Sequence, residues 1–425
     1  MILTEKTSPT GQRRLALALE TARTWFADNG LPLAMVIVAA YVYVLRQPAF
    51  ITAPAFWAED GNIYFKGAVE HGLSSVFDPY NGQVFIFQRI VALLAAPLPV
   101  LIQPAIYAIV AVATAVLCCS ILLSPRWRYP VPLAARFLCA LALLCSPAVD
   151  EVYANLTNAH WWLALGLILL AMLSDPKSRL GRLGEIVYTA VTALSGVGAV
   201  FALPALGVRC LKNRSRHSLG LAGIALAGSI AQVAFLVSST RHLNGAGLSH
   251  HPLTSLLILL RRVPGVAVVG DTNLSALWPD RMPVTWLWLL LITLGLALTA
   301  LWVASARRLE LATLLLALVA GWILALAGAP SPVEGLLRGG RYFVVPVAML
   351  YVSLVLSWPT SAFRRTMAGL ACLLLATGIL SDYHLYPLPA YDWSSFAACM
   401  DHGTATTCTT TIAPDWTLQV TRPGR

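Results

Sequence analysis

The chain has 425 residues, of which 58% are hydrophobic and 11% are charged. Soluble proteins carry about 25% charged residues, so this composition excludes an ordinary soluble domain. The formal net charge of +10 comes from basic residues in short clusters between long apolar runs, which is typical of cytoplasmic loops and excludes nucleic acid as a partner. We therefore expect an all-α polytopic membrane protein, and the Ala/Leu/Arg-rich composition suggests a bacterial inner membrane.

The first apolar segment covers about residues 31–46 and follows a basic arm. Because basic flanks remain in the cytoplasm, we expect the N-terminus inside and the loop 47–101 outside. Within that loop, the apolar piece 84–98 should lie along the outer interface. If it crossed the membrane, the basic loop SPRWRYP would fall outside and the acidic loop DEVYANLTNAH inside, which inverts the positive-inside rule.

The densest acidic stretch of the chain follows the first span. Glu59, Asp60, Glu70 and Asp78 lie close together in a chain with 19 acidic residues. Residues 62–77 have the spacing of an amphipathic helix, so together with 84–98 they predict two interfacial helices joined by the turn DPYNG. The sequence Ala-Glu-Asp-Gly is then left at the membrane surface, where its glycine allows a tight bend.

The remaining apolar segments alternate across the membrane with their basic loops inside. The segment 185–208 has basic loops on both sides and is broken at Ser-Gly-Val-Gly, which predicts two short helices that meet near the outer side. The piece 253–269 contains Arg261 and Arg262 and is expected to be interfacial or re-entrant. Further spans are expected at about 102–123, 131–147, 159–173, 218–238, 284–303, 311–328, 342–357 and 366–380.

These segments define the expected domain organisation. They give about eleven membrane segments when the broken pair is counted as two. Residues 1–380 would form the membrane domain, and residues 381–425 a small extracytoplasmic tail.

Four stretches of the sequence carry a family resemblance. A carboxylate pair directly after the first span, followed by two interfacial helices and a Pro/Gly turn, resembles the GT-C superfamily of polytopic glycosyltransferases. The stretches VDEVYANLTNAHWWLAL, LSGVGAVFALP and LLRGGRYFVVP are similar to bacterial O-antigen glucosyltransferase and mannosyltransferase-type proteins. The resemblance implies an enzyme that moves a sugar from a polyprenyl-phosphate donor to a glycan, lipid or protein acceptor on the outer face of the membrane.

Transfer from a lipid phosphate needs a base for the acceptor hydroxyl. We expect Asp60 to be this base, with Glu59 as the second choice or as an orienting partner. The alternative is that one of the two only caps the following helix, a role worth about 1 kcal/mol. Some GT-C members bind a divalent ion through Asp-x-Asp, whereas here the pair is an adjacent Glu-Asp. We therefore assign no cofactor, and a divalent metal stays an open alternative that no Asp-x-Asp motif supports.

The departing phosphate also requires cations. The candidates are Arg89 in the first interfacial run, and Arg338 and Arg341 beside Tyr342 in LLRGGRYF. Arginine fits a phosphate bidentately. Arg261 and Arg262 are weaker candidates. The alternative for all of them is an interfacial position with the head group reaching water.

The loop DEVYANLTNAHWW offers contacts for a sugar or an acceptor. Its candidate residues are Asp150, Glu151, Asn155, Asn158, His160 and Trp161. Asparagine forms hydrogen bonds with hydroxyls, and the tryptophan ring stacks on a sugar face. The alternative is an aromatic belt at the membrane boundary together with helix capping.

Cys399 and Cys408 lie in the polar tail, whereas the other cysteines lie in apolar runs or at the end of one. The environment outside the membrane is oxidising, so we predict a disulfide between them.

Two other functional classes remain open. A transporter or flippase would usually show internal repeats and charges within its spans. Here the acidic residues concentrate in outer loops, which favours an enzyme. A non-catalytic assembly or scaffold protein is the third possibility.

Overall fold

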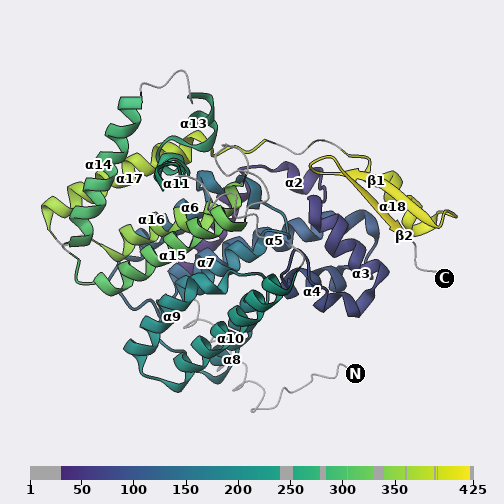
Figure 1. The fold of residues 1–425 in the computed structure, drawn as a ribbon, viewed down its shortest axis with the longest axis horizontal. Coiled ribbons are helices and arrows are strands. Elements are labelled where there is room, and N and C mark those ends of the chain that lie inside the picture. Colours follow the sequence, from purple (N-terminus) through teal and green to yellow (C-terminus); the bar gives the residue numbers. More distant parts are fainter. Residues whose placement is uncertain are drawn as a thin grey trace, which may run out of the picture.

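The computed structural model describes residues 30–239, 252–277, 284–303, 305–328, 339–358, 361–386, 389 and 391–421. Apolar helices form a bundle, and a smaller part that contains α3, α4, α18 and the hairpin β1–β2 projects from it (Figure 1). Within the described ranges, four helices are long and apolar enough to cross a membrane, namely Val100–Leu123, Arg216–Ser238, Arg308–Leu326 and Ala362–Ser381. Shorter apolar helices accompany them, which confirms the mostly helical membrane fold.

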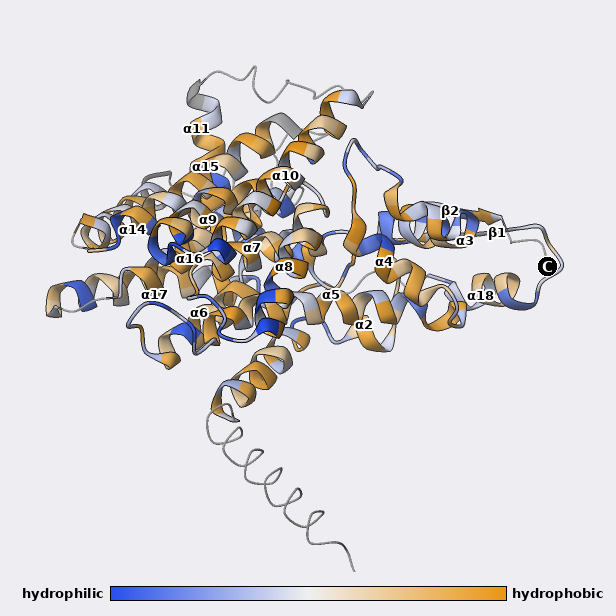
Figure 2. Ribbon diagram, turned by 90° about the horizontal axis from the view of Figure 1, so that it is seen from below, coloured by the Kyte–Doolittle hydropathy of each residue, from blue (hydrophilic) through white to orange (hydrophobic). Residues whose placement is uncertain are grey.

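Helix α7 (Ala159–Ala171) forms the centre of the bundle. All of its residues are buried, as expected for a helix that is apolar on every side. It packs against α5 (Gln103–Ser120), α9 (Ala199–Asn213) and α16 (Val344–Leu356). By contrast, α10 (Arg216–Ser238) exposes large apolar side chains on its outer surface. Figure 2 shows that hydrophobic residues dominate the helices of the bundle.

The other bundle helices lie close to the segments expected from hydropathy, apart from the short helix Asp271–Leu277, which forms in a stretch expected to be an outer loop. They are the first helix Gly30–Val44, α6 (Leu133–Leu144), α8 (Arg179–Ala193), α11 (Pro252–Leu260), α12 (Val266–Val269), α13 (Asp271–Leu277), α14 (Val284–Val303), α15 (Arg308–Gly328) and α17 (Ala362–Ser381). The predicted break lies between α8 and α9, where Gly196 has a φ of 81°. A side chain there would crowd Phe85 and His160, so glycine is required for both its conformation and its size.

The first loop forms short helices where a single one was predicted over 62–77. After α2 (Ala49–Thr52), a π-helical turn (Asp60–Phe65) leads into α3 (Lys66–Glu70), a 3-10 helix follows (Gly72–Phe77), and α4 covers Ile86–Ala95. The division falls at Gly72, whose φ of 57° ends α3, because a left-handed residue terminates a helix. Leu73, Phe77 and Leu94 expose their side chains.

The C-terminal part contains a β-hairpin, so the expectation of an all-α fold is wrong here. Helix α18 (Trp393–His402) is followed by β1 (Thr407–Ile412) and β2 (Trp416–Thr421), which pair antiparallel from Thr407–Thr421 to Ile412–Trp416. Both strands are rich in β-branched residues, which favour a pleated surface. Cys399 and Cys408 form a disulfide that joins α18 to β1. We call residues 393–421 the tail module.

The tail module packs on the first loop. Trp393 and Phe396 lie in one buried cluster with Phe56 and Phe65. The ring centroids of Phe56 and Trp393 are 4.8 Å apart, an edge-to-face distance that stabilises aromatic pairs. The amino acids after the first span are therefore enclosed by residues from the far end of the described chain.

Candidate active site

Asp60 joins two loops that are distant in the sequence. Its side chain is 2% exposed. One carboxylate oxygen, Oδ2, accepts a hydrogen bond from the Leu156 amide at 3.1 Å. The other, Oδ1, accepts from the Thr157 amide at 2.6 Å and from the Thr157 hydroxyl at 2.5 Å. The structure shows no side-chain cap at the start of its own helix. Asp60 instead binds residues 156–157 to the first loop.

The environment of Asp60 raises the pKa of its carboxyl. Burial raises the pKa of this carboxyl to about 7, although the hydrogen bonds from Thr157 and Leu156 act in the opposite direction. The neighbouring charge of Glu59 raises the pKa further. Glu59 itself is less buried, and its Oε1 lies 3.5 Å from the Tyr80 hydroxyl. A carboxyl that titrates near neutral pH is suited to general-base catalysis.

Glu151 holds the turn that carries Arg341. Its Oε1 accepts a hydrogen bond from the Gly339 amide at 2.9 Å, and its Oε2 accepts from the Arg341 amide at 3.1 Å. The guanidinium of Arg341 lies 4.0 Å from the same carboxylate. Gly339 has a φ of 70°, a conformation that favours glycine. The carboxylate of Glu151 is thus committed to this turn.

The charge of Glu59 influences the pKa of Arg341. Burial lowers its pKa, but Tyr342, Glu151 and Glu59 outweigh this effect and raise the pKa overall. The guanidinium carbon lies 5.3 Å from the centroid of the Tyr342 ring. Its side chain is 28% exposed, so this cation is open to a ligand.

The start of α7 lies between these groups. The ring centroid of Trp161 is 5.7 Å from that of Tyr342 and 4.9 Å from that of His160. His160 Nδ1 is 2.9 Å from the carbonyl oxygen of Thr157. We call Glu59, Asp60, Glu151, His160, Trp161, Arg341 and Tyr342 the polar cluster, because these contacts connect the first loop, the 151–158 loop, α7 and the 339–342 turn.

The two predicted asparagines form hydrogen bonds within their own loop. Asn155 Nδ2 donates to the carbonyl oxygens of Glu151 and Tyr153, and Asn155 Oδ1 accepts from Asn158. Asn158 Nδ2 also donates to Glu151 at 2.9 Å. Both amides therefore shape the 151–158 loop.

Of the two remaining predicted arginines, the structure describes Arg89. Arg89 donates to the carbonyl oxygens of Ile63 at 2.8 Å and Asp78 at 3.2 Å, and its guanidinium lies over the ring of Tyr64. It therefore joins the short helices of the first loop to α4. Arg338 lies outside the described residues.

One neighbour of the cluster was not predicted as a site residue. Thr157 binds Asp60, but its sequence context shows only an Asn-x-Thr pattern, and the two residues are 97 positions apart. Asp150, a predicted candidate of the same loop, also lies beside the cluster, because a Cβ atom on Gly340 would be 3.1 Å from its Oδ1. Burial raises the pKa of its carboxyl to about 7, and the charges of Glu151 and Asp271 raise it further.

Arg262, one of the weaker candidates, is buried close to these residues. Its guanidinium lies 5.0 Å from the Phe343 ring and 3.4 Å from the Asp271 carboxylate. It therefore lies directly behind the turn that carries Arg341.

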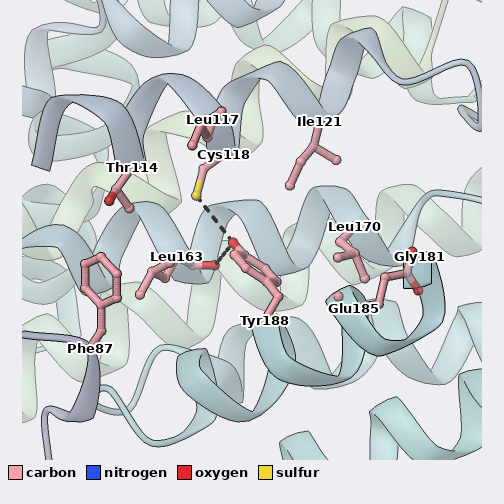
Figure 3. A pocket seen from close by; sticks show the side chains of 11 residues that line it. Phe87, Thr114, Leu117, Cys118, Ile121, Leu163, Leu170, Gly181, Glu185 and Tyr188 are labelled. Carbon is pink, nitrogen blue, oxygen red and sulfur yellow. Dashed lines mark hydrogen bonds between the residues drawn. The ribbon is translucent and has the colours of Figure 1, made fainter. Parts of the chain in front are cut away.

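A separate cavity of about 450 Å³ lies between α5, α7 and α8 and is lined mainly by apolar side chains (Figure 3). Tyr188 crosses it and donates a hydrogen bond to the carbonyl oxygen of Leu163 at 2.8 Å. None of the predicted site residues lines it. Among the residues that the structure describes, no group of three or more His, Cys, Asp or Glu side chains is arranged to hold a metal ion.

No protein-family model and no curated protein matches this sequence. A similarity was found to one solved structure, the crystal structure of ArnT from Cupriavidus metallidurans bound to undecaprenyl phosphate. The TM-score is 0.42 with 15% sequence identity, and the match covers 78% of this chain and 61% of the ArnT chain. This chain thus spans less than two thirds of ArnT. A similarity of this size concerns the course of the backbone and carries no information about chemistry.

Proposed function

We propose that this protein is a polytopic glycosyltransferase of the bacterial inner membrane. It would move a sugar from a polyprenyl-phosphate donor to a glycan, lipid or protein acceptor on the outer face. The observation that carries this proposal is the polar cluster. A carboxylate of near-neutral pKa lies in the same group of contacts as a partly exposed arginine and aromatic rings, and these are the three elements that the reaction requires.

In the proposed reaction, the acceptor hydroxyl attacks the anomeric carbon of the donor. A new carbon–oxygen bond forms, and the bond between the sugar and the phosphate breaks with its electron pair remaining on the phosphate. Arg341 would stabilise that charge. Asp60 would take the proton of the hydroxyl, with Glu59 as orienting partner or alternative base. A carboxylate has about four lone-pair sites, and three donors occupy Asp60, so one remains for the acceptor.

Two buried polar atoms in this region are compatible with a bound ligand. Trp161 Nε1 and Asp150 Oδ1 have no hydrogen-bond partner within the described part of the chain. Buried polar atoms in native proteins almost always have a partner. A sugar hydroxyl both donates and accepts, so it would satisfy an indole N–H and a carboxyl oxygen. The Trp161 ring would supply the apolar contact that a sugar face favours.

The proposal is tested with purified protein in vesicles that also contain native membrane lipids and glycans. Undecaprenyl-phosphate-linked glucose and mannose are supplied in turn, and the release of undecaprenyl phosphate is measured. We expect Asp60→Asn to reduce the release by about 10²–10⁴-fold, the usual contribution of a general base. Asp78→Asn is the matched control, because Asp78 is a partly exposed carboxylate of the same loop that pairs with His71.

Three outcomes would contradict this proposal. Full activity of the Asp60→Asn variant would reject the assignment of the base. Failure of the native protein to consume any such donor would reject the enzyme. Movement of the donor across the bilayer without its consumption would indicate a flippase instead.

A further inference from the structure

The tail module pairs with the segment that leads into the acidic pair. Trp57 forms a parallel β-bridge with Ala413. The Ala58 amide donates to the Ala413 carbonyl oxygen at 2.5 Å, and the Ala413 amide donates to the Phe56 carbonyl oxygen at 3.2 Å. The backbone is thus fixed by the end of β1 immediately before Glu59.

The backbone at this point is unusual. Ala58 has a φ of 23°, a value that residues with a Cβ rarely adopt. Such a conformation persists only where the surrounding structure enforces it. Two hydrogen bonds with Ala413 hold residues 56 and 58 on either side of Trp57 and so support this conformation.

A second contact lies on the other side of the acidic pair. A Cβ atom on Gly61 would be 2.6 Å from Ile412 Cδ1, whereas its next neighbour, Leu418 Cδ2, would be 3.4 Å away. Ile412 is 1% exposed. The backbone at Gly61 therefore rests directly on the Ile412 side chain, and one methyl group of that side chain sets the limit of approach.

The hairpin is itself anchored on the first loop and held within the tail module. The Thr421 amide donates to Glu70 Oε1 at 2.8 Å. Trp393 Nε1 donates to the Val100 carbonyl oxygen at 3.0 Å, and the disulfide ties β1 to the helix that carries this tryptophan. Ile412 and Ala413 are therefore held in place from both sides of the hairpin.

We propose that the tail module positions the catalytic carboxylates, with Ile412 as the positioning residue. This inference rests on the proposed function, since it assigns the module a role in the same site. Ala413 and Ile412 contact residues 56–58 and 61, which flank Glu59 and Asp60, and thereby set the distance between these carboxylates and the 339–342 turn. Ile412 does not contact the reacting groups.

The test is a pair of substitutions of complementary size. Gly61→Ala adds a methyl that collides with Ile412 Cδ1, and Ile412→Val removes that atom. We expect Gly61→Ala to lower kcat on the order of 10²-fold, the effect of a displacement of about 1 Å at a reacting group. KM should change little. In the double variant kcat should recover by about tenfold or more, because contacting sites are not additive.

A helix-propensity argument and a control variant separate an effect on positioning from an effect on folding. Alanine favours a helix more than glycine does, so a loss in Gly61→Ala cannot come from a weaker helix. Thr409→Ala changes a side chain on the exposed face of the same strand and should leave kcat unchanged. If the double variant is no more active than Gly61→Ala, the proposed contact does not govern the site.

A measurement without substrate separates this inference from the proposed function. Amide hydrogen exchange is followed in peptides that cover residues 56–65. Ile412→Ala should accelerate their exchange, while Thr409→Ala should not. Unchanged exchange in Ile412→Ala overturns the inference even if the enzyme is confirmed. If the native protein consumes no lipid-linked sugar but exchange accelerates, the contact is established and only the catalytic assignment fails.

Discussion

At the scale of single residues, the Asp60 carboxylate accepts several hydrogen bonds and nevertheless has a pKa near neutrality. Three donors hold its two oxygens, and such bonds normally keep a carboxylate ionised in acid. Burial acts more strongly in the opposite direction and raises the pKa to about 7. The carboxylate is therefore held in one position and is still able to take up a proton near neutral pH.

The pH dependence of activity should report this residue. The base must be ionised, so kcat/KM should fall as the pH drops below about 7, and the pKa of Asp60 in the free protein sets the position of this decline. Thr157→Val removes a hydrogen bond that lowers this pKa, so it should shift the decline to higher pH. Steady-state rates between pH 5 and 9 provide the measurement, and a decline unmoved by Thr157→Val would contradict the assignment.

The contribution of Asp60 to the stability of the folded protein should decrease as the pH rises, whereas activity should increase. The pKa of Asp60 is raised in the folded state from 3.8 to about 7. The folded protein therefore binds this proton more tightly than the unfolded chain, and the contribution to stability is lost as the pH rises through about 7.

At the scale of elements, hydropathy predicts the spans well and the first loop and the tail poorly. The segment expected at 218–238 is a helix over Arg216–Ser238, and the one at 366–380 is a helix over Ala362–Ser381. Long apolar runs leave few alternatives in a membrane. The hairpin was not predicted, because an isolated pair of short strands is marginally stable and β1–β2 depends on partners distant in the sequence.

The disulfide of the tail module should matter for its stability. Replacing both Cys399 and Cys408 by alanine removes a cross-link over nine residues, which we expect to cost about 2–3 kcal/mol within the tail module. Limited proteolysis of the purified protein should then cut residues 393–421 faster, while the bundle stays protected. Non-reducing mass mapping of the native protein that finds both thiols free would contradict this prediction.

Some residues of the site can be predicted from the local sequence, and others only from tertiary contacts. The acidic pair and Arg341 were predicted because charge stands out in an apolar sequence. Thr157 and Ile412 were not, because nothing local marks a threonine or an isoleucine as the partner of residues in the first loop. Their roles arise only from the way the loops meet.

At the scale of the whole molecule, polar groups gather beyond both ends of α7. Asp60 and Arg341 lie near its first residues, and Arg209 is buried in ion pairs with Asp175 and Glu185 beyond its last. A helix of 13 residues separates the two groups by about 20 Å. This arrangement is expected if α7 crosses the membrane and the charged groups lie at its two surfaces.

This arrangement predicts a topology that can be tested with an impermeant thiol reagent on intact cells. The six free cysteines are replaced and the disulfide is kept. A cysteine at Ser74, an exposed position in the first loop, should react from outside. A cysteine at Arg216, exposed at the start of α10, should react only after the membrane is permeabilised. The reverse pattern would overturn the predicted orientation.

The contact between the first loop and the tail module has a consequence for biogenesis. Glu70 and Thr421, which are hydrogen-bonded, are separated by 351 residues. Ribosomes add about 5–20 residues per second, so the acidic pair leaves the ribosome roughly 20–70 seconds before its support. During that interval the backbone on either side of the carboxylates would lack its contacts with Ile412 and Ala413. Under the proposed function, activity would then begin only after the hairpin has been synthesised, exported and packed on the first loop.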